Sequence, residues 1–252
     1  MYDLYVIPGS HACRAAILML RHKELPYRRI QLVTGMHSMT ARMYGFDSGG
    51  QIRDVGGKRS PGLRFADRFG TVPGLAAGSE RISTNYAIAR FLDEQHPERP
   101  LLPADPERRQ AVEEAERWAN KTLQMEARRI IGAAVMRDPA GFNERADDGR
   151  LGYLLYKSST IRRWAAPLIL RQVFLSGEAD DAQLLSNLES MLDRVDGWIA
   201  AGVLGGDDIN VADCMVAPSL ALILYRPDVR PMFEGRPALA LVDRLLPEPA
   251  TA

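Results

Sequence analysis

The sequence predicts a mixed α/β domain followed by an all-helical domain. Two observations lead to this fold class. A strand, a helix and a second strand follow one another within the first 33 residues, which is the spacing of a βαβ unit. After a proline-rich stretch, HPERPLLPADP at 96–106, the apolar residues recur only at helical spacing. We therefore predict an α/β domain at 1–95, a linker at 96–105 and a helical domain at 106–252.

The first domain has a clear order of elements. Short apolar or alternating runs bounded by turn residues indicate strands, and Pro26 ends the first helical run. The predicted elements are a strand at 2–7, a helix at 12–22, a strand at 27–33, two short strands at 74–76 and 81–82, and a helix at 84–95.

The segment 35–70 interrupts this order. It carries eight glycines and no sustained hydrophobic period, so we expect an insertion without regular structure, either a lid or a solvated loop. Six Lys or Arg residues against three Asp residues give it a local charge of +3. As a lid, it would supply cations to an acidic ligand.

The second domain carries several helix signals. Asp105 is a suitable N-cap before Pro106. Leucine, valine and isoleucine recur at spacings of three and four between Leu185 and Ile199, which predicts an amphipathic helix. Asn210 and Asp213 are spaced as a capping box at the start of another helix.

Composition excludes several functional classes. The chain has 252 residues, with 32 Lys or Arg balanced by 32 Asp or Glu, which argues against binding nucleic acid or an anionic membrane through bulk charge. Two cysteines cannot form a disulfide framework, and no run is long enough for a signal peptide or a membrane span. We expect a cytoplasmic protein without a metal. Only four of the 32 basic residues are lysines, which suggests a GC-rich coding sequence.

Chemistry is expected where the first strand meets the first helix. Ser10 and Cys13 lie at this turn, where unpaired N–H groups and the helix dipole stabilise a thiolate. The alternative is a capping serine beside a small buried cysteine. Val72-Pro73 precedes a short strand, and its peptide bond is either cis, exposing the Val72 backbone to a ligand, or trans at a strand edge.

Taken together, these motifs resemble the cytosolic glutathione S-transferase superfamily over nearly the whole chain, except for about 35 residues after the second strand. The resemblance rests on the S-x-x-C helix start, Val72-Pro73, the run Ile82 to Ile88, the PLLP sequence at 100–103 and the Asn-Val-Ala-Asp sequence at 210–213. It implies a thioredoxin-like N-terminal domain, a helical-bundle C-terminal domain and a homodimer.

The resemblance also implies residue roles. Ser10 would donate a hydrogen bond to the sulfur of a thiol peptide, with Cys13 either redox-active or merely packed. The Val72 backbone, before a cis Pro73, would pair with the cysteinyl part of that ligand. Thr84 and Asn85 would face its γ-glutamyl carboxylate, in the place of the family's Glu-Ser pair.

This replacement and the arginine bias together suggest an actinobacterial host and mycothiol as an alternative to glutathione. The second substrate would be a hydrophobic electrophile between the domains. Its candidate lining residues are Trp118, Met125, Tyr153, Tyr156 and Trp164.

Three functions remain open. The first is a transferase that joins a low-molecular-weight thiol to the electrophile. The second is a thiol-dependent isomerase or thiol-disulfide reductase. The third is a non-catalytic binding protein on the same fold.

Overall fold

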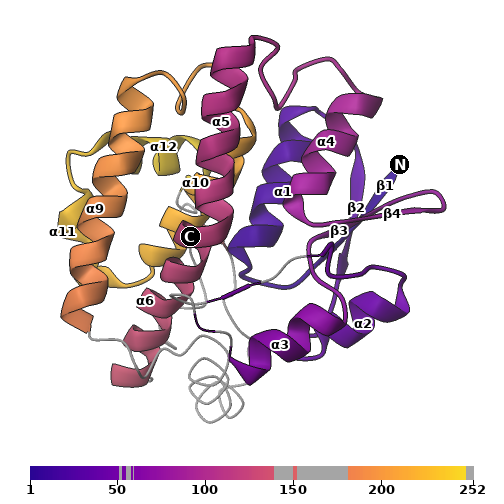
Figure 1. Ribbon diagram of the computed structural model, residues 1–252, viewed down its shortest axis with the longest axis horizontal. Helices are drawn as coiled ribbons and strands as arrows, with labels where there is room; N and C mark the ends of the chain where they lie inside the picture. The colour runs from indigo at the N-terminus through magenta and orange to yellow at the C-terminus, as the bar shows by residue number, and fades with distance from the viewer. Residues whose placement is uncertain (51–52, 55–57, 59, 139–149, 152–180, 248–252) are drawn as a thin grey trace, which may run out of the picture.

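The protein consists of an α/β half and a helical half that lie side by side (Figure 1). The computed structural model describes residues 1–50, 53–54, 58, 60–138, 150–151 and 181–247. One continuous cluster of buried apolar side chains extends through both halves. The predicted boundary at 96–105 therefore separates two kinds of architecture that share a core.

A four-stranded mixed sheet forms the centre of the α/β half. Its strand order is β2-β1-β3-β4, with β1 and β2 parallel and the other neighbours antiparallel. The strands are β1 (Tyr2–Val6), β2 (Tyr27–Gln31), β3 (Gly74–Ala77) and β4 (Glu80–Ser83). This thioredoxin-like sheet, followed by helices, confirms the predicted fold class.

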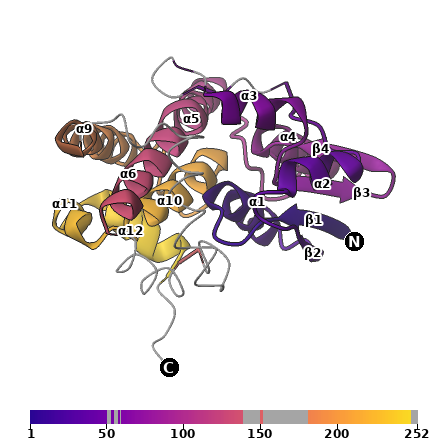
Figure 2. The same cartoon turned by 90° about the horizontal axis from the view of Figure 1, so that it is seen from below.

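Helix α1 (His11–His22) joins the two halves. It lies between the sheet and α10 (Val211–Ile223) in both views (Figures 1 and 2). Because it packs on two sides, it buries most of its length, including Met19 and Leu20, which are completely inaccessible. A helix that is apolar almost all round is what this sandwiched position requires.

The prediction of an irregular insertion at 35–70 is wrong, because the described part of this segment contains two helices. They are α2 (His37–Met43) and α3 (Pro61–Arg68). One of the glycines that suggested a loop instead allows close packing: a Cβ at Gly70 would lie 2.7 Å from the backbone carbonyl oxygen of Phe46, whose side chain is fully buried. The segment thus supplies part of the core.

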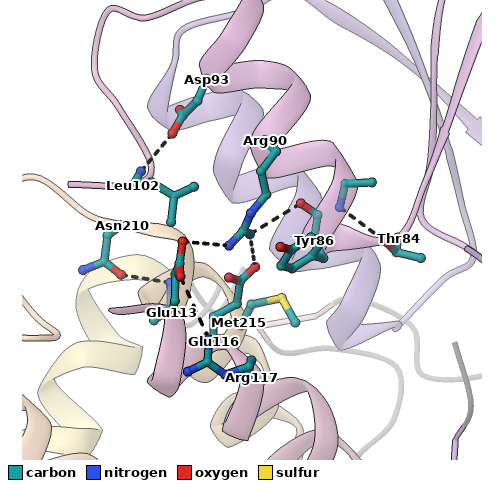
Figure 3. Close-up of polar contacts among 12 residues, drawn as sticks. Thr84, Tyr86, Arg90, Asp93, Leu102, Glu113, Glu116, Arg117, Asn210 and Met215 are labelled. Atoms are coloured by element: carbon teal, nitrogen blue, oxygen red, sulfur yellow. Dashed lines mark hydrogen bonds and ion pairs between the residues drawn. The ribbon is translucent and has the colours of Figure 1, made fainter. Parts of the chain in front are cut away.

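The proline-rich linker is held against α4 by hydrogen bonds and by buried side chains. Leu101 and Leu102 are buried, and their backbone N–H groups both donate to the carboxylate of Asp93 at 2.9 Å. Asp93 belongs to α4 (Asn85–Gln95), and its bond to Leu102 is visible in Figure 3. Lys23 adds an ion pair to Asp93 at 2.8 Å. A linker held in this way fixes the relative position of the two halves.

Every regular element described after the linker is helical. A continuous helical segment runs through α5 (Pro106–Trp118), a π-helical turn η1 (Ala119–Leu123) and α6 (Gln124–Arg137). The remaining elements are α9 (Asp181–Ala200), α10, the 3₁₀ turn η2 (Pro227–Val229), α11 (Arg230–Phe233) and α12 (Pro237–Leu245). Asp105 caps α5, and Asn210 with Asp213 forms the predicted capping box of α10. Within the described ranges, no helix combines the length and the apolar character needed to cross a bilayer.

Candidate functional site

A cavity with a volume of 590 Å³ lies between the two halves. This size is within the range of small-molecule sites. One wall comes from the α/β half and the other from η1 and α6 of the helical half. Its lining residues are Ala12, Gly50, Arg53, Asp54, Thr71, Val72, Pro73, Thr84, Asn85, Asn120, Lys121, Thr122, Gln124, Met125 and Arg128.

The α/β wall brings together four of the residues that the sequence singled out. The Val72-Pro73 peptide bond is cis, and Thr84 and Asn85 lie beside it in the lining. Thr84 has φ of 76°, a conformation that is strained for a β-branched residue. Its hydroxyl accepts from the Ala87 N–H at 3.2 Å and so caps α4. The wall is therefore held rigidly at the start of α4.

Asn85 is the residue of this wall with a side-chain acceptor available to a ligand. Its side-chain Nδ2 donates to the Ala12 carbonyl at 2.9 Å, which ties α4 to α1. Its Oδ1 is buried and has no hydrogen-bond partner among the described residues, although the side chain lines the cavity. A buried, unpaired acceptor is costly. A ligand N–H or ammonium group in the cavity would satisfy it.

The helical wall is polar. Of its six described lining residues, only Met125 is apolar, and the π-helical turn contributes Asn120, Lys121 and Thr122. Short π-helical turns are frequent at functional sites. Of the two described candidates for the electrophile pocket, Met125 lines the cavity, whereas Trp118 packs against Trp198, at 5.1 Å between ring centroids. Tyr153, Tyr156 and Trp164 lie outside the described residues.

Positive charge is concentrated around this cavity. Burial, followed by the charge of Arg53, lowers the pKa of Arg128 to about 9, so its guanidinium remains protonated at neutral pH. Burial, with smaller effects of Arg53 and Arg128, lowers the pKa of His37 to about 4. Burial and then Arg128 also hold the pKa of His11 well below its usual value. Both histidines are therefore neutral at pH 7, and the arginines supply the charge.

Ser10 and Cys13 line a different, smaller hollow of 60 Å³ at the start of α1. The Ser10 hydroxyl accepts from the Cys13 N–H at 3.2 Å, so Ser10 is the N-cap of α1. Cys13 is 2% exposed, and burial raises the pKa of its thiol to about 11 in spite of hydrogen bonds from Ser10 and Ile7. These features match the capping serine and buried cysteine that the sequence left as an alternative, and the predicted catalytic roles of both residues remain predictions.

Several lining residues were not singled out from the sequence. Arg128, Gln124 and the residues of η1 belong to a helical run whose periodicity predicts a helix but not which face meets a cavity. Arg53, one of the basic residues of the 35–70 segment, lines the cavity, and its predicted role towards an acidic ligand remains a prediction. No group of three or more His, Cys, Asp or Glu side chains in the described part of the chain could hold a metal ion.

Comparisons with solved structures show which known proteins have a similar fold. The glutathione transferase GSTFuA3 from Phanerochaete chrysosporium matches with a TM-score of 0.67 and 16% identity, covering 100% of this chain and 98% of that one. A glutathione S-transferase of Ceriporiopsis subvermispora, in complex with glutathione, matches with a TM-score of 0.57 and 18% identity over 99% of both chains. FzlA from C. crescentus matches with a TM-score of 0.54 and 20% identity, over 97% of this chain and 87% of its own.

The chain therefore has the glutathione S-transferase fold, as the sequence resemblance predicted. No protein-family model matches the sequence. No curated protein matches it either.

Proposed function

We propose that this protein binds a low-molecular-weight thiol, glutathione or mycothiol, in the 590 Å³ cavity and transfers its sulfur to an electrophile. The observation that carries the proposal is the α/β wall, where Val72, Pro73, Thr84 and Asn85 line one cavity. The glutathione complex of the Ceriporiopsis subvermispora enzyme supports this assignment, because it has the same fold.

Val72, Thr84 and Asn85 bind two different parts of the thiol in the proposed complex. The Val72 backbone pairs with the cysteinyl part of the thiol. Thr84 and Asn85 bind the γ-glutamyl end of glutathione or the corresponding end of another thiol. The unpaired Oδ1 of Asn85 accepts from the ligand, which compensates for the absence of the glutamate common in the family.

The chemical step needs a thiolate. Lowering a thiol pKa by two units requires about 2.7 kcal/mol of differential stabilisation. In this proposal the positive end of α1, where Ala12 lines the cavity, and the charge of Arg128 supply much of this stabilisation. The predicted hydrogen bond from the Ser10 hydroxyl would add to it only if that hydroxyl turned from the smaller hollow towards the cavity. The S–H bond breaks and its proton goes to solvent; a C–S bond then forms as the leaving group departs with its electron pair.

Calorimetric titration tests the thiol site. We expect wild-type protein to bind glutathione or mycothiol, and Asn85→Ala to bind it about tenfold more weakly, since a hydrogen bond to a charged group contributes roughly 1.5 kcal/mol. Asn187→Ala is the matched control, because Asn187 pairs with Gln183 on the surface of α9. The proposed thiol site would be contradicted if the wild type bound neither thiol, or if Asn85→Ala bound the thiol as tightly as Asn187→Ala.

A non-catalytic thiol-binding protein is the second candidate. The observation that favours it is the position of Ser10 and Cys13 at the smaller hollow. Thiol binding without turnover of any electrophile in a broad panel would favour this candidate. Thiol-dependent isomerisation or disulfide reduction would appear as turnover without a stable conjugate.

We further propose that the protein is a cytoplasmic homodimer. Light scattering coupled to size-exclusion chromatography should then give about twice the chain mass of 28.0 kDa. A mass equal to that of one chain at micromolar concentration would exclude the homodimer.

A further inference from the structure

Three arginines of α1 and β2 lie near one another. Arg14 and Arg21 occupy one face of α1, two turns apart, and Ile17 lies between them. Arg29 is on β2, an edge strand of the sheet, and shares a face of that strand with Gln31. Arg14, Arg29 and Gln31 all line the 60 Å³ hollow at the start of α1. The fold thus brings basic side chains from two elements to one small hollow.

These guanidinium groups have no counter-ion in the part of the chain that the structure describes. The side chains of Arg14, Arg21 and Arg29 take part in no hydrogen bond or ion pair there. By contrast Arg28, the neighbour of Arg29 on β2, is paired with Asp3 at 2.8 Å. The described lining of the hollow includes no Asp or Glu. An excess of positive charge without compensation favours the binding of an anion.

The three arginines also repel one another. Burial lowers the pKa of Arg14, and the charges of Arg21 and Arg29 lower it further. The phenols of Tyr225 and Tyr27 oppose this effect, but they are uncharged at neutral pH. Folding therefore gathers like charges at a cost in free energy, which a bound anion would offset.

The donors around the hollow suit a phosphate group better than a carboxylate. A phosphate monoester carries nearly two negative charges at neutral pH and has three acceptor oxygens, whereas a carboxylate has one charge and two oxygens. Arg14 and Arg29 offer two planar forks of N–H donors, and Gln31 offers an amide. The Ser10 hydroxyl accepts from the Cys13 N–H, so its own proton is available to donate. The start of α1 adds the positive end of a helix dipole.

The size of the hollow limits what it can hold. Sites that enclose a whole small molecule have volumes of about 300 Å³ or more, and this hollow has 60 Å³. It therefore has room for one charged group, with the rest of the ligand in solvent.

We propose that this hollow binds a phosphate group, of a small phosphate monoester or of free phosphate, through Arg14 and Arg29, with Arg21 adding charge from the same face of α1. The inference goes beyond the proposed thiol transfer. The hollow and the 590 Å³ cavity share no lining residue among those that the structure describes, so the phosphate site stands or falls independently of the thiol site.

Calorimetric titration at pH 8, in a low-salt buffer without phosphate, tests the proposal with phenyl phosphate, inorganic phosphate and benzoate. We expect the wild type to bind phenyl phosphate at least tenfold more tightly than benzoate. Arg14→Gln should weaken the binding of phenyl phosphate about tenfold or more, because it removes hydrogen bonds to a charged group. Arg14→Lys, which keeps the charge but not the fork, should retain part of the affinity.

Arg28→Gln is the matched control, because it removes the same charge from the opposite face of β2. We expect it to change the binding of phenyl phosphate less than twofold. Unfolding curves verify the fold of each variant, and Arg29→Gln, at an exposed position, provides a second test if Arg14→Gln does not fold.

The relative affinities of the two phosphates identify the source of the group. Tighter binding of phenyl phosphate than of inorganic phosphate would assign the site to a monoester, and the reverse would assign it to free phosphate. The inference would be overturned if the wild type bound neither phosphate, if benzoate bound as tightly as phenyl phosphate, or if Arg14→Gln and Arg29→Gln bound phenyl phosphate as tightly as Arg28→Gln.

Discussion

Ser10 has a structural task that is independent of catalysis. Its hydroxyl oxygen accepts from the Cys13 N–H and caps α1, the helix that joins the two halves. We expect Ser10→Ala to lower the free energy of unfolding by about 1 kcal/mol, the usual contribution of an N-cap. Urea denaturation measures this loss.

Ser10→Asp separates the cap from the proposed hydrogen bond to sulfur. Aspartate is an equally good N-cap but, when ionised, has no proton to donate. We expect it to recover most of the stability and none of the transferase rate. Full activity in Ser10→Asp would contradict a donor role for the hydroxyl.

Cys13 should be unreactive in the native protein. Because burial raises the pKa of its thiol to about 11, only about one molecule in a thousand carries the thiolate at pH 8. We expect labelling of Cys13 by a disulfide reagent at pH 8 to be far slower than in urea, and Cys13→Ala to keep the transferase rate. Rapid native labelling, located by mass spectrometry, would instead support a redox role.

At the scale of helices, a buried arginine connects α9 to the end of α10. Arg226 is 1% exposed and forms ion pairs with Asp181 at 2.6 Å and with Asp228 at 2.7 Å. We expect Arg226→Gln to lower the free energy of unfolding by about 3 kcal/mol, at the low end for buried pairs because both carboxylates retain contact with water. Arg109→Gln, which removes a guanidinium from an exposed position of α5, is the control.

The ion pairs of Arg226 also predict how the free energy of unfolding depends on pH. Hydrogen bonds from Arg226 hold the pKa values of Asp181 and Asp228 below their usual values. Lowered carboxyl pKa values stabilise the folded state above the unfolded pKa near 3.9, and this stability is lost as pH falls through the lower folded values. Unfolding free energies measured from pH 6 to pH 3 should therefore fall less steeply in Arg226→Gln. If the free energy of unfolding fell equally steeply with pH in the wild type and in Arg226→Gln, Arg226 would not be the cause of the lowered carboxyl pKa values.

At the scale of the whole molecule, Arg90 forms ion pairs that cross between the halves, with Glu116 and with Glu113 (Figure 3). Arg90 of α4 donates to Glu116 of α5 at 2.5 Å, and its guanidinium lies 3.7 Å from the centroid of the Tyr86 ring. Glu116 is 2% exposed, and burial raises its carboxyl pKa against the opposing effect of Arg90. The carboxylate thus depends on Arg90 for its charge compensation.

We expect Arg90→Met to lower the free energy of unfolding by about 3 kcal/mol, since it leaves a buried carboxylate without its cation. The double variant Arg90→Met/Glu116→Met should recover most of this loss, because two apolar side chains replace the pair. Urea denaturation of the wild type, both single variants and the double variant measures the coupling. Strictly additive losses would show that the pair contributes no coupling.

The elements with strong local signals were predicted from the sequence, and those with weak signals were missed. Apolar spacing and caps predicted α1, α9 and α10 within a few residues. Helices α2 and α3 have only seven and eight residues in a glycine-rich segment, and their stability comes from packing. Ser38 and Ala41 of α2 are buried, and the absence of a side chain at Gly74 admits the Phe46 ring. Such contacts depend on residues distant in sequence, which local patterns do not report.

The amino-acid sequence by itself determined the order of strands and helices outside the 35–70 segment, the caps of α5 and α10, and the segments that carry Val72, Thr84 and Asn85. Periodicity and capping are local properties, so they can be read along the chain. Only the tertiary structure decided which side chains share a cavity. It placed Val72, Thr84 and Asn85 with Arg128, and it put Ser10 and Cys13 at a separate hollow. The charged residues of the second wall are Lys121 of η1 and Arg128 of α6, and packing between the two halves decides that these side chains face the cavity.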